Sequence, residues 1–264
     1  MTATAERKVA FITGASGGQG KVAVEKFVSE GYRVVAADLS IDAVAGVRDE
    51  VVSRYEGADV LALAVDQGSE ESLVAAAAAV REWSGKIDAL LLFAGVVQRD
   101  GIPLLSMSTA EWDRVHGVNL RGVFFACREL APLIPTQAGG SIVTISSWWG
   151  QSAHPFYSAY CTSKAGVISL TQSLAAELAD SGIRVNSVAP GNIDTPMHRE
   201  ALRGEAEERG VSFDEMKAIE WAKIPLKVAG PPSAIVDAAF WLASDQSSYV
   251  TGATIDVNGG VQMR

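Results

Sequence analysis

The chain has 264 residues, of which 48% are hydrophobic and 20% are charged, so it can bury a large core and is not globally disordered. Its 22 basic and 31 acidic residues give a formal net charge of −9, and this argues against general nucleic-acid binding, because an acidic surface repels phosphate backbones. A small anionic cofactor is not excluded, since backbone N–H groups at a helix N-terminus can bind it locally.

Short apolar segments typical of buried strands alternate along the chain with longer segments typical of helices. The predicted strands are residues 8–13, 32–37, 59–65, 87–93, 141–146, 183–189 and 253–257. The predicted helices are residues 18–30, 41–54, 70–83, 111–133, 157–180 and 233–243. This alternation predicts an α/β fold with a single doubly wound, Rossmann-type parallel sheet and helices on both faces.

One long polar stretch, at about residues 196–226, interrupts this alternation. It contains two glycines, Gly204 and Gly210, together with Met216. A segment of this length between sheet elements is typical of a substrate lid or a binding segment. Because no Pro-, Gly- or Ser-rich linker divides the chain, residues 1–264 are predicted to form one domain.

The cysteines and histidines are too few and too scattered for a disulfide framework or a metal site. The two cysteines, Cys127 and Cys161, form no CxxC pattern, and the three histidines have no metal-ligand spacing. Residues 1–8 contain no apolar signal core, and no apolar run is long enough to cross a membrane. We therefore expect a cytoplasmic protein with no metal and no membrane partner.

A glycine-rich turn, TGASGGQG at residues 13–20, joins the first predicted strand to the first predicted helix. Glycine permits a tight turn and lets backbone N–H groups approach a pyrophosphate, and the helix N-terminus that follows adds the positive end of a dipole. The alternative is an ordinary structural turn. The position between the first strand and the first helix favours a dinucleotide site.

Acidic residues end the second and third predicted strands. Asp38 lies 18 residues after Gly20, where an acid that binds the adenosine ribose is expected. Its carboxylate can accept from both ribose hydroxyls and would repel a 2′-phosphate, which favours NAD over NADP. Asp66 is placed to accept from the adenine amino group. Both acids have a second interpretation, as caps of the helices that follow them.

A tyrosine, a lysine and a serine form a possible chemical unit near the ends of the strands. Tyr160 and Lys164 are four residues apart on a predicted helix and share one face, and Ser147 comes just after the fifth predicted strand. A tyrosine with its usual pKa of about 10 is a poor base at pH 7, whereas a neighbouring ammonium and a cationic nicotinamide both favour the phenolate.

Taken in this order, the motifs resemble the short-chain dehydrogenase/reductase family over nearly the whole chain. The resemblance rests on TGASGGQG (13–20), Asp38, Asp66, Asn119 in VNLRGVFF, ISS (145–147), YCTSK (160–164), PGNIDTPM (190–197) and YVTGATIDVNGG (249–260). It implies one doubly wound domain that both binds a nicotinamide cofactor, here NAD, and carries the catalytic residues.

By matching position, the resemblance implies that Tyr160 is the general acid/base, that Lys164 lowers its pKa and holds the nicotinamide ribose, and that Ser147 binds the reacting oxygen. It implies that Asn119 supports a water linking Lys164 to solvent, the alternative being a polar residue that satisfies helix backbone groups. The positions expected to bind the cofactor are Gly14, Ser16, Gly18, Gln19, Gly20, Asp38, Leu39, Asp66, Gln67, Ala94, Gly95, Tyr160, Lys164, Pro190, Gly191, Ile193, Thr195 and Met197.

Two positions depart from the family pattern. Phe93 stands where an NAG motif usually has Asn, a side chain that helps to tie the central strands together. The departure affects a hydrogen bond of the sheet and does not affect the hydride chemistry. Gln19 replaces a usual aliphatic residue, and its backbone N–H can still bind phosphate.

Aromatic residues near Ser147 indicate the substrate pocket. The residues expected to contact substrate are Trp148, Trp149, His154, Tyr157 and Trp221. Two adjacent tryptophans are costly to expose, so they favour a bulky apolar, cyclic or aromatic substrate, and the alternative is that they pack in the core or between subunits. Methionines in the 196–226 stretch can adapt to such a ligand.

We therefore expect an NAD(H)-dependent oxidoreductase that interconverts a small-molecule secondary alcohol and a ketone. A 3-oxoacyl-thioester reductase is the alternative among enzymes, although Asp38 and the charge of −9 disfavour the phosphorylated cofactor and the acidic carrier protein that it needs. A non-catalytic dinucleotide sensor is the alternative from another class, and the Tyr160 and Lys164 pair argues against it. The surplus of apolar positions on two long helices, read with the resemblance, implies a homotetramer.

Overall fold

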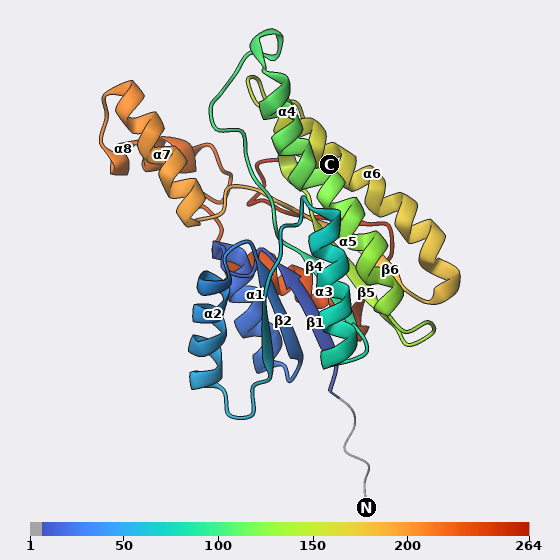
Figure 1. Cartoon of the computed structure of the whole chain (residues 1–264). Coiled ribbons are helices and arrows are strands. Elements are labelled where there is room, and N and C mark those ends of the chain that lie inside the picture. Colours follow the sequence, from blue (N-terminus) through green and yellow to red (C-terminus); the bar gives the residue numbers. More distant parts are fainter. Residues whose placement is uncertain (1–6, 264) are drawn as a thin grey trace, which may run out of the picture.

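Seven strands, all parallel, form one sheet in the order β3-β2-β1-β4-β5-β6-β7 in the computed structural model, which describes residues 7–263 (Figure 1). The strands are β1 (Val9–Thr13), β2 (Arg33–Asp38), β3 (Val60–Ala64), β4 (Ala89–Leu92), β5 (Ser141–Ile145), β6 (Arg184–Pro190) and β7 (Thr254–Val257). The predicted fold class is confirmed. The N-terminal residues 1–6, where the sequence shows no signal core, lie outside the described residues.

Helices cover both faces of the sheet. They are α1 (Gly18–Ser29), α2 (Ile41–Arg54), α3 (Glu70–Trp83), α4 (Thr109–His116), α5 (Gly122–Leu130), α6 (Ser158–Leu178), α7 (Pro196–Arg209), α8 (Phe213–Ala222) and α9 (Pro232–Ala243). The bounds predicted for α2 and α3 are the observed ones. In the structure a Ser N-cap precedes each of these helices and accepts from a backbone N–H three residues on.

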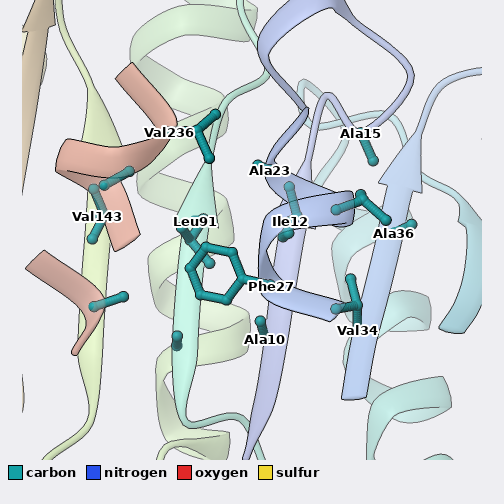
Figure 2. Packing of buried hydrophobic residues seen from close by; sticks show 14 of the residues in the cluster. Ala10, Ile12, Ala15, Ala23, Phe27, Val34, Ala36, Leu91, Val143 and Val236 are labelled. Carbon is teal, nitrogen blue, oxygen red and sulfur yellow. The ribbon is translucent and has the colours of Figure 1, made fainter. Parts of the chain in front are cut away.

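Alternate residues of each strand point to opposite faces, so the sheet separates two cores. On one face Ile12 of β1 and Leu91 of β4 pack with Phe27 of α1 and Val236 of α9 (Figure 2). On the other face, residues of β1, β4 and β5 pack against α3, α5 and α6. Two covered faces explain why the strands read as nearly continuous apolar runs.

The long helical pattern predicted over 111–133 is not one regular α-helix. α4 is followed by a π-helical turn, η2 (Gly117–Arg121), then by α5, and a 3₁₀ turn, η3 (Ala131–Leu133), ends the segment. Apolar periodicity does not distinguish these helix types, because a π-turn inserts one residue without ending the helix.

The polar stretch at 196–226 contains α7 and α8, which pack against each other beside the end of the sheet (Figure 1). Their small cluster of Leu202, Ala206 and Met216 is separate from the two cores of the sheet. Within residues 7–263 no helix has the length and apolar character needed to span a bilayer, and no group of three or more His, Cys, Asp or Glu is placed to hold a metal.

Candidate active site

A cavity of about 730 Å³ opens at the carboxyl ends of the strands. Ligands of doubly wound sheets bind at this edge, where the strand order reverses between β1 and β4. All of the positions predicted to bind cofactor line the cavity: Gly14, Ser16, Gly18, Gln19, Gly20, Asp38, Leu39, Asp66, Gln67, Ala94, Gly95, Tyr160, Lys164, Pro190, Gly191, Ile193, Thr195 and Met197. The structure therefore brings all of these predicted residues together around one cavity.

The glycine-rich turn has the shape that a pyrophosphate requires. Gly14 has φ +66°, and a Cβ there would lie 2.8 Å from the backbone N of Ala94, so a side chain would strain the turn and collide with the backbone that follows β4. A Cβ on Gly20 would collide with the carbonyl oxygen of Gly14. The cap of α1, Gly17, supplies no side-chain acceptor. The first N–H groups of α1 therefore face a cradle that fits a phosphate of a dinucleotide.

Asp38 is held against this turn rather than against the next helix. Its Oδ2 accepts from the backbone N and the Oγ of Ser16, at 2.8 and 2.7 Å, and its Oδ1 accepts from the N of Leu39 at 2.7 Å. The N-cap of α2 is Ser40, so the alternative interpretation of Asp38 as a helix cap is wrong. Its carboxylate lies at the cavity wall, where a ribose would meet it.

Asp66 and Gln67 follow β3 and reach into the same wall. The Oδ1 of Asp66 accepts from the N of Gly68 at 2.8 Å, and Ser69 is the N-cap of α3, so the capping interpretation of Asp66 is also wrong. Gln67 is buried, and both ends of its amide are bound within the protein. It accepts from Thr13 Oγ1 at 2.7 Å and donates to the carbonyl oxygens of Ala94 and Val118.

The side chains of Thr13 and Gln67 make the tie between the central strands that an Asn at position 93 usually makes in the family. The Thr13 hydroxyl accepts from the N of Ala94 at 3.2 Å while it donates to Gln67, so the two side chains join the ends of β1 and β4 to the π-turn. The ring of Phe93 packs against the core on the α1 and α9 side. The tie between the central strands is thus made by polar groups from β1 and from the loop after β3.

α6 carries Tyr160 and Lys164 to the end of the cavity beside Ser147, which follows β5. The Nζ of Lys164 donates to the carbonyl oxygen of Ile145 at 2.8 Å and lies 5.8 Å from the centre of the Tyr160 ring. A Cβ on Gly95 would lie 3.3 Å from that Nζ, so a side chain there would crowd the ammonium. Burial lowers the pKa of Lys164 to about 8.

The protein alone does not favour the phenolate of Tyr160. Burial raises its pKa, the hydrogen bond with the Ser147 side chain lowers it, and the neighbouring Cys161 raises it slightly. The lowered pKa expected from the sequence is therefore not a property of these residues by themselves. A cationic group in addition to Lys164 would oppose the effect of burial.

Asn119 lies in the π-turn and is fully buried. Its Oδ1 accepts from the N of Val96, and its Nδ2 donates to the carbonyl oxygen of Val96, each at 2.8 Å. Its Nδ2 also reaches Ser163 Oγ at 3.1 Å. Its side chain thus satisfies backbone groups of the loop after β4, and the residue is not part of the cavity wall.

An aromatic cluster borders the catalytic end. Trp148 and Trp149 line the cavity, and the ring of Trp149 meets that of Tyr160 edge to face at 5.9 Å. His154 stacks on Trp149 at 3.9 Å, and Tyr157 contacts it at 5.0 Å, but neither residue is part of the wall. Their observed contacts are those of packing behind Trp149.

Trp221 is also not among the lining residues. It lies on α8, where the Lys217 ammonium is 4.2 Å from its ring centre. His198 of α7, which was not predicted, does line the cavity, and its Nε2 is buried without a hydrogen-bond partner. Burial lowers the pKa of His198, so its ring is neutral at pH 7. Its position directly after the PGNIDTPM motif was the available signal.

A doubly wound sheet with a glycine-rich turn at its switch point is the architecture of dinucleotide-binding domains. Residues 14–262 match the family described as enoyl-(acyl carrier protein) reductase. The chain is 38% identical over 258 residues to the 3-oxoacyl-[acyl-carrier-protein] reductase FabG of Thermotoga maritima, covering 97% of this chain and 98% of the relative. It is 36% identical over 253 residues to 2-(R)-hydroxypropyl-CoM dehydrogenase of Xanthobacter autotrophicus, covering 96% and 97%.

Among solved structures, levodione reductase superposes with a TM-score of 0.90 at 29% identity, covering 96% of each chain. The chain belongs to the short-chain dehydrogenase/reductase family of oxidoreductases. Members of this family act with a nicotinamide dinucleotide, and the glycine turn and the strand-end acids fit such a cofactor.

Proposed function

We propose that this protein is an NAD(H)-dependent oxidoreductase that interconverts a secondary alcohol and a ketone. One observation carries the proposal: Tyr160, Ser147 and Lys164 line the same cavity as the glycine turn and Asp38. When bound, the nicotinamide supplies or accepts the hydride. The residues of the chain hold the substrate oxygen and move its proton.

In this mechanism the Ser147 hydroxyl binds the reacting oxygen and aligns it with the Tyr160 hydroxyl. Tyr160 takes the proton during alcohol oxidation and returns it during ketone reduction. Lys164 stabilises the phenolate, and its ammonium, which lines the cavity, would hold the nicotinamide ribose. Because burial raises the pKa of Tyr160, loss of its proton during alcohol oxidation would be favoured by the positive charge that an oxidised nicotinamide would bring into the cavity.

Cofactor preference tests the role of Asp38. We expect the wild type to use NAD(H) with a kcat/KM at least about tenfold above that for NADP(H), because hydrogen bonds to charged groups contribute about 1.5–3 kcal/mol each and the 2′-phosphate meets a like charge. Steady-state kinetics with both cofactors measure the ratio. Asp38→Ala should reduce the ratio of kcat/KM for NAD(H) to that for NADP(H). An equal or higher kcat/KM with NADP(H) in the wild type would overturn the proposal.

A second substitution separates charge from structure at this position. Because Asp38 also holds the Ser16 N–H, Asp38→Ala disturbs the turn as well as the ribose site. Asp38→Asn keeps an acceptor oxygen and removes the charge. It should therefore reduce the preference for NAD(H) over NADP(H) while lowering the affinity for the dinucleotide less than Asp38→Ala does. Asp42→Ala, on the exposed first turn of α2, is the control for net charge and should leave the ratio unchanged.

For the substrate we propose a bulky ketone or alcohol with a cyclic or aromatic group. The support is the wall of Trp148 and Trp149 beside Tyr160, together with Met197 on the opposite segment. The described lining residues at this end carry no charged group other than Lys164, which favours an uncharged substrate. The packing observed for His154, Tyr157 and Trp221 leaves their contact with substrate a prediction.

Trp149→Ala is expected to raise KM for bulky ketones more than for small ones, because filling the space of an indole with apolar ligand contributes at most a few kcal/mol. The measurement compares KM for a cyclic and a short acyclic ketone in the wild type and the variant. Trp83→Ala is the control for the loss of an indole, because Trp83 is on α3 and is not among the residues that line the cavity. An equal change for all substrates, or weaker assembly alone, would favour the packing interpretation of the tryptophans.

A 3-oxoacyl-thioester reductase is a second candidate, favoured by the 38% identity to FabG of Thermotoga maritima. The carboxylate of Asp38 and the net charge of −9 argue against a phosphorylated cofactor and an acidic carrier. A screen of secondary alcohols, ketones and a 3-oxoacyl thioester with both cofactors decides between the two. Absence of turnover with every substrate, despite dinucleotide binding, would instead support the sensor class.

We also propose that residues 1–264 act as one catalytic domain, that α7 and α8 form the substrate lid, and that the protein is a cytoplasmic homotetramer. The apolar hollow beside α4, η2 and α6, which includes Leu120, Phe124 and Leu170, supports burial against a second copy. Phe124 keeps 42% of its surface exposed in the single chain. Sedimentation analysis measures the assembly, and a monomer at micromolar concentration would refute it.

A further inference from the structure

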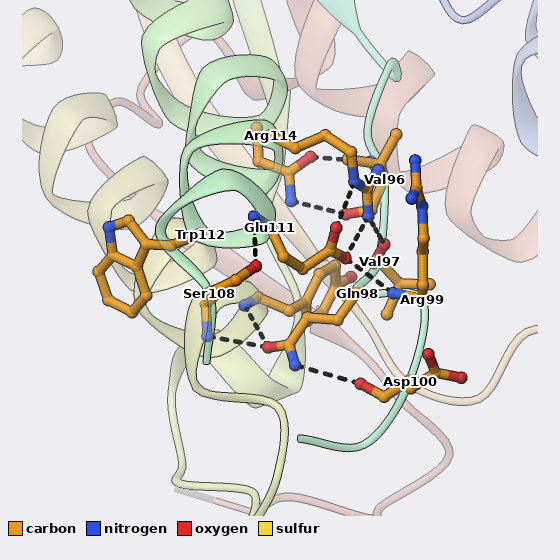
Figure 3. A network of polar contacts seen from close by, with 12 residues as sticks. Val96, Val97, Gln98, Arg99, Asp100, Ser108, Glu111, Trp112 and Arg114 are labelled. Atoms are coloured by element: carbon orange, nitrogen blue, oxygen red, sulfur yellow. Dashed lines mark hydrogen bonds and ion pairs between the residues drawn. The ribbon is translucent and has the colours of Figure 1, made fainter. Parts of the chain in front are cut away.

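In the loop that follows β4, successive residues from 96 to 99 form hydrogen bonds with neighbouring helices (Figure 3). Val96 is bound through its backbone to Asn119, and the carbonyl oxygen of Val97 accepts from Arg114 at 2.8 Å. The N of Arg99 donates to Glu111 at 2.9 Å. Between these two anchors, Gln98 turns inward toward α6.

Gln98 is only 2% exposed, and all of its amide hydrogen-bonding groups have partners. Its Oε1 accepts from the backbone N of Ala159 at 2.9 Å and of Tyr160 at 3.2 Å. Its Nε2 donates to the carbonyl oxygens of Phe156 at 2.9 Å and Asp100 at 3.3 Å. A primary amide is the side chain that accepts on one side and donates on the other in this way.

These bonds replace the cap that α6 lacks. Tyr157 occupies the N-cap position of α6 and provides no side-chain acceptor, so the first N–H groups of the helix would otherwise be without a partner in a buried place. Phe156, just before the helix, has φ +69°, a strained conformation for a residue other than glycine. Gln98 binds Phe156 and the first turn together, and so fixes how the chain enters α6.

We infer that Gln98 is a positioning residue for Tyr160: it clamps the first turn of α6 and thereby sets where the Tyr160 hydroxyl stands relative to Ser147. This inference rests on the proposed role of Tyr160. Tyr160 lies in the first turn, where helices fray, whereas Lys164, one turn later, is anchored independently through Ile145. The clamp is therefore specific to the residue that moves the proton.

The loop can serve as a clamp because it is itself rigidly held. Glu111 receives two hydrogen bonds from Arg114, at 2.8 and 2.7 Å, in addition to the bond from Arg99. These contacts lower the pKa of Glu111 to about 2, so the ion pair persists through the pH range of activity assays. Gln98 thus fixes the start of α6 relative to α4 and the π-turn, because the loop that carries Gln98 is bonded to both of them.

Gln98→Met tests the clamp, because it keeps the length of the side chain and removes both polar ends. We expect kcat to fall about tenfold or more, since small misplacements of catalytic groups are costly, while the Kd for the dinucleotide stays within about twofold. Gln137→Met is the matched control. Gln137 binds the other end of the same helix region, where its Nε2 donates to the carbonyl oxygen of Asp180 at 2.6 Å, and its loss should leave kcat unchanged.

A double-mutant cycle shows whether Gln98 acts through Tyr160. In a Tyr160→Phe background, Gln98→Met should cause no further loss of kcat. Gln98→Glu keeps an oxygen for the two N–H groups of α6 and should retain a kcat between those of wild type and Gln98→Met. A kcat for Gln98→Met within twofold of wild type, an additive loss in the double variant, or a lower kcat for Gln98→Glu than for Gln98→Met would overturn the inference.

A readout without substrate separates this inference from the proposed function. In protein labelled with fluorotyrosine, the ¹⁹F signal missing from Tyr160→Phe belongs to Tyr160. That signal should shift in Gln98→Met and not in Gln137→Met, and an unshifted signal would refute the clamp. If Gln98→Met does not fold, the same comparison is made with Gln98→Glu. If the wild type turns over no alcohol or ketone, the proposed function fails, while the ¹⁹F comparison still decides the role of Gln98.

Discussion

Tyr160→Phe is expected to lower kcat by about 10²–10⁴-fold and to leave folding and NAD binding intact, because it removes one hydroxyl and keeps the ring. Proton transfer by a positioned group contributes this much, and Tyr160 is the only tyrosine among the described lining residues. NAD titration combined with steady-state kinetics makes the measurement. Ser147→Ala should also lower kcat with nearly unchanged NAD affinity, because Ser147 orients the substrate oxygen.

Tyr249→Phe is the control, since this side chain is fully exposed on the surface. It should retain wild-type turnover. If Tyr160→Phe binds NAD normally and keeps more than about a tenth of wild-type turnover, the proton passes through another group and the mechanism is wrong.

Lys164→Ala is expected to reduce kcat and, unlike Tyr160→Phe, to weaken NAD binding, because the ammonium is proposed to contact the nicotinamide ribose. It should also change the pH profile. The Nζ of Lys164 lies 5.8 Å from the centre of the Tyr160 ring, and a positive charge at such a distance favours the phenolate. Losing this charge raises the pKa of Tyr160. Alcohol oxidation requires the phenolate, so the pH at which its rate rises should move to higher pH.

Ketone reduction requires protonated Tyr160, so its rate at neutral pH should depend less on this charge. Because the pKa of Lys164 is lowered to about 8 by burial, the wild-type ammonium supports the phenolate below that pH and is lost above it. Rate profiles of both directions from pH 6 to 10 make the comparison. An unchanged rising limb of alcohol oxidation in Lys164→Ala would show that the charge does not act on Tyr160. Lys223→Ala, on an exposed side chain, is the control.

The framework of the fold follows from the sequence because strands buried on both faces are apolar throughout and the segments between them have the lengths and patterns of helices. The exception is instructive. α7 and α8 were expected only as an irregular polar segment, since Gly204 and Gly210 interrupt their pattern. In the structure, Gly210 ends α7 in a left-handed conformation, and Ser212 with Glu215 forms a capping box for α8. Local capping there outweighs a weak apolar pattern.

The cavity wall could be predicted because parallel strand ends meet at one edge of the sheet, so residues that follow strands converge whatever their separation in the sequence. Gln98 could not be found in this way. It contacts Ala159 and Tyr160 across about sixty residues, and no spacing rule connects a loop glutamine to a helix start. The packing of His154 and Tyr157 behind Trp149 was missed for a similar reason, because proximity in sequence to Ser147 does not fix which way a ring turns.

The separate cluster of Leu202, Ala206 and Met216 has a consequence for hydrogen exchange. Amides of α7 and α8 are protected by this cluster and by their caps, whereas those of β1 and β4 are protected by both cores of the sheet. The two helices can therefore unfold together as a local unit, at a free energy below that of global unfolding. If α7 and α8 are the lid proposed above, a large ketone could enter by this local opening while the sheet remains folded.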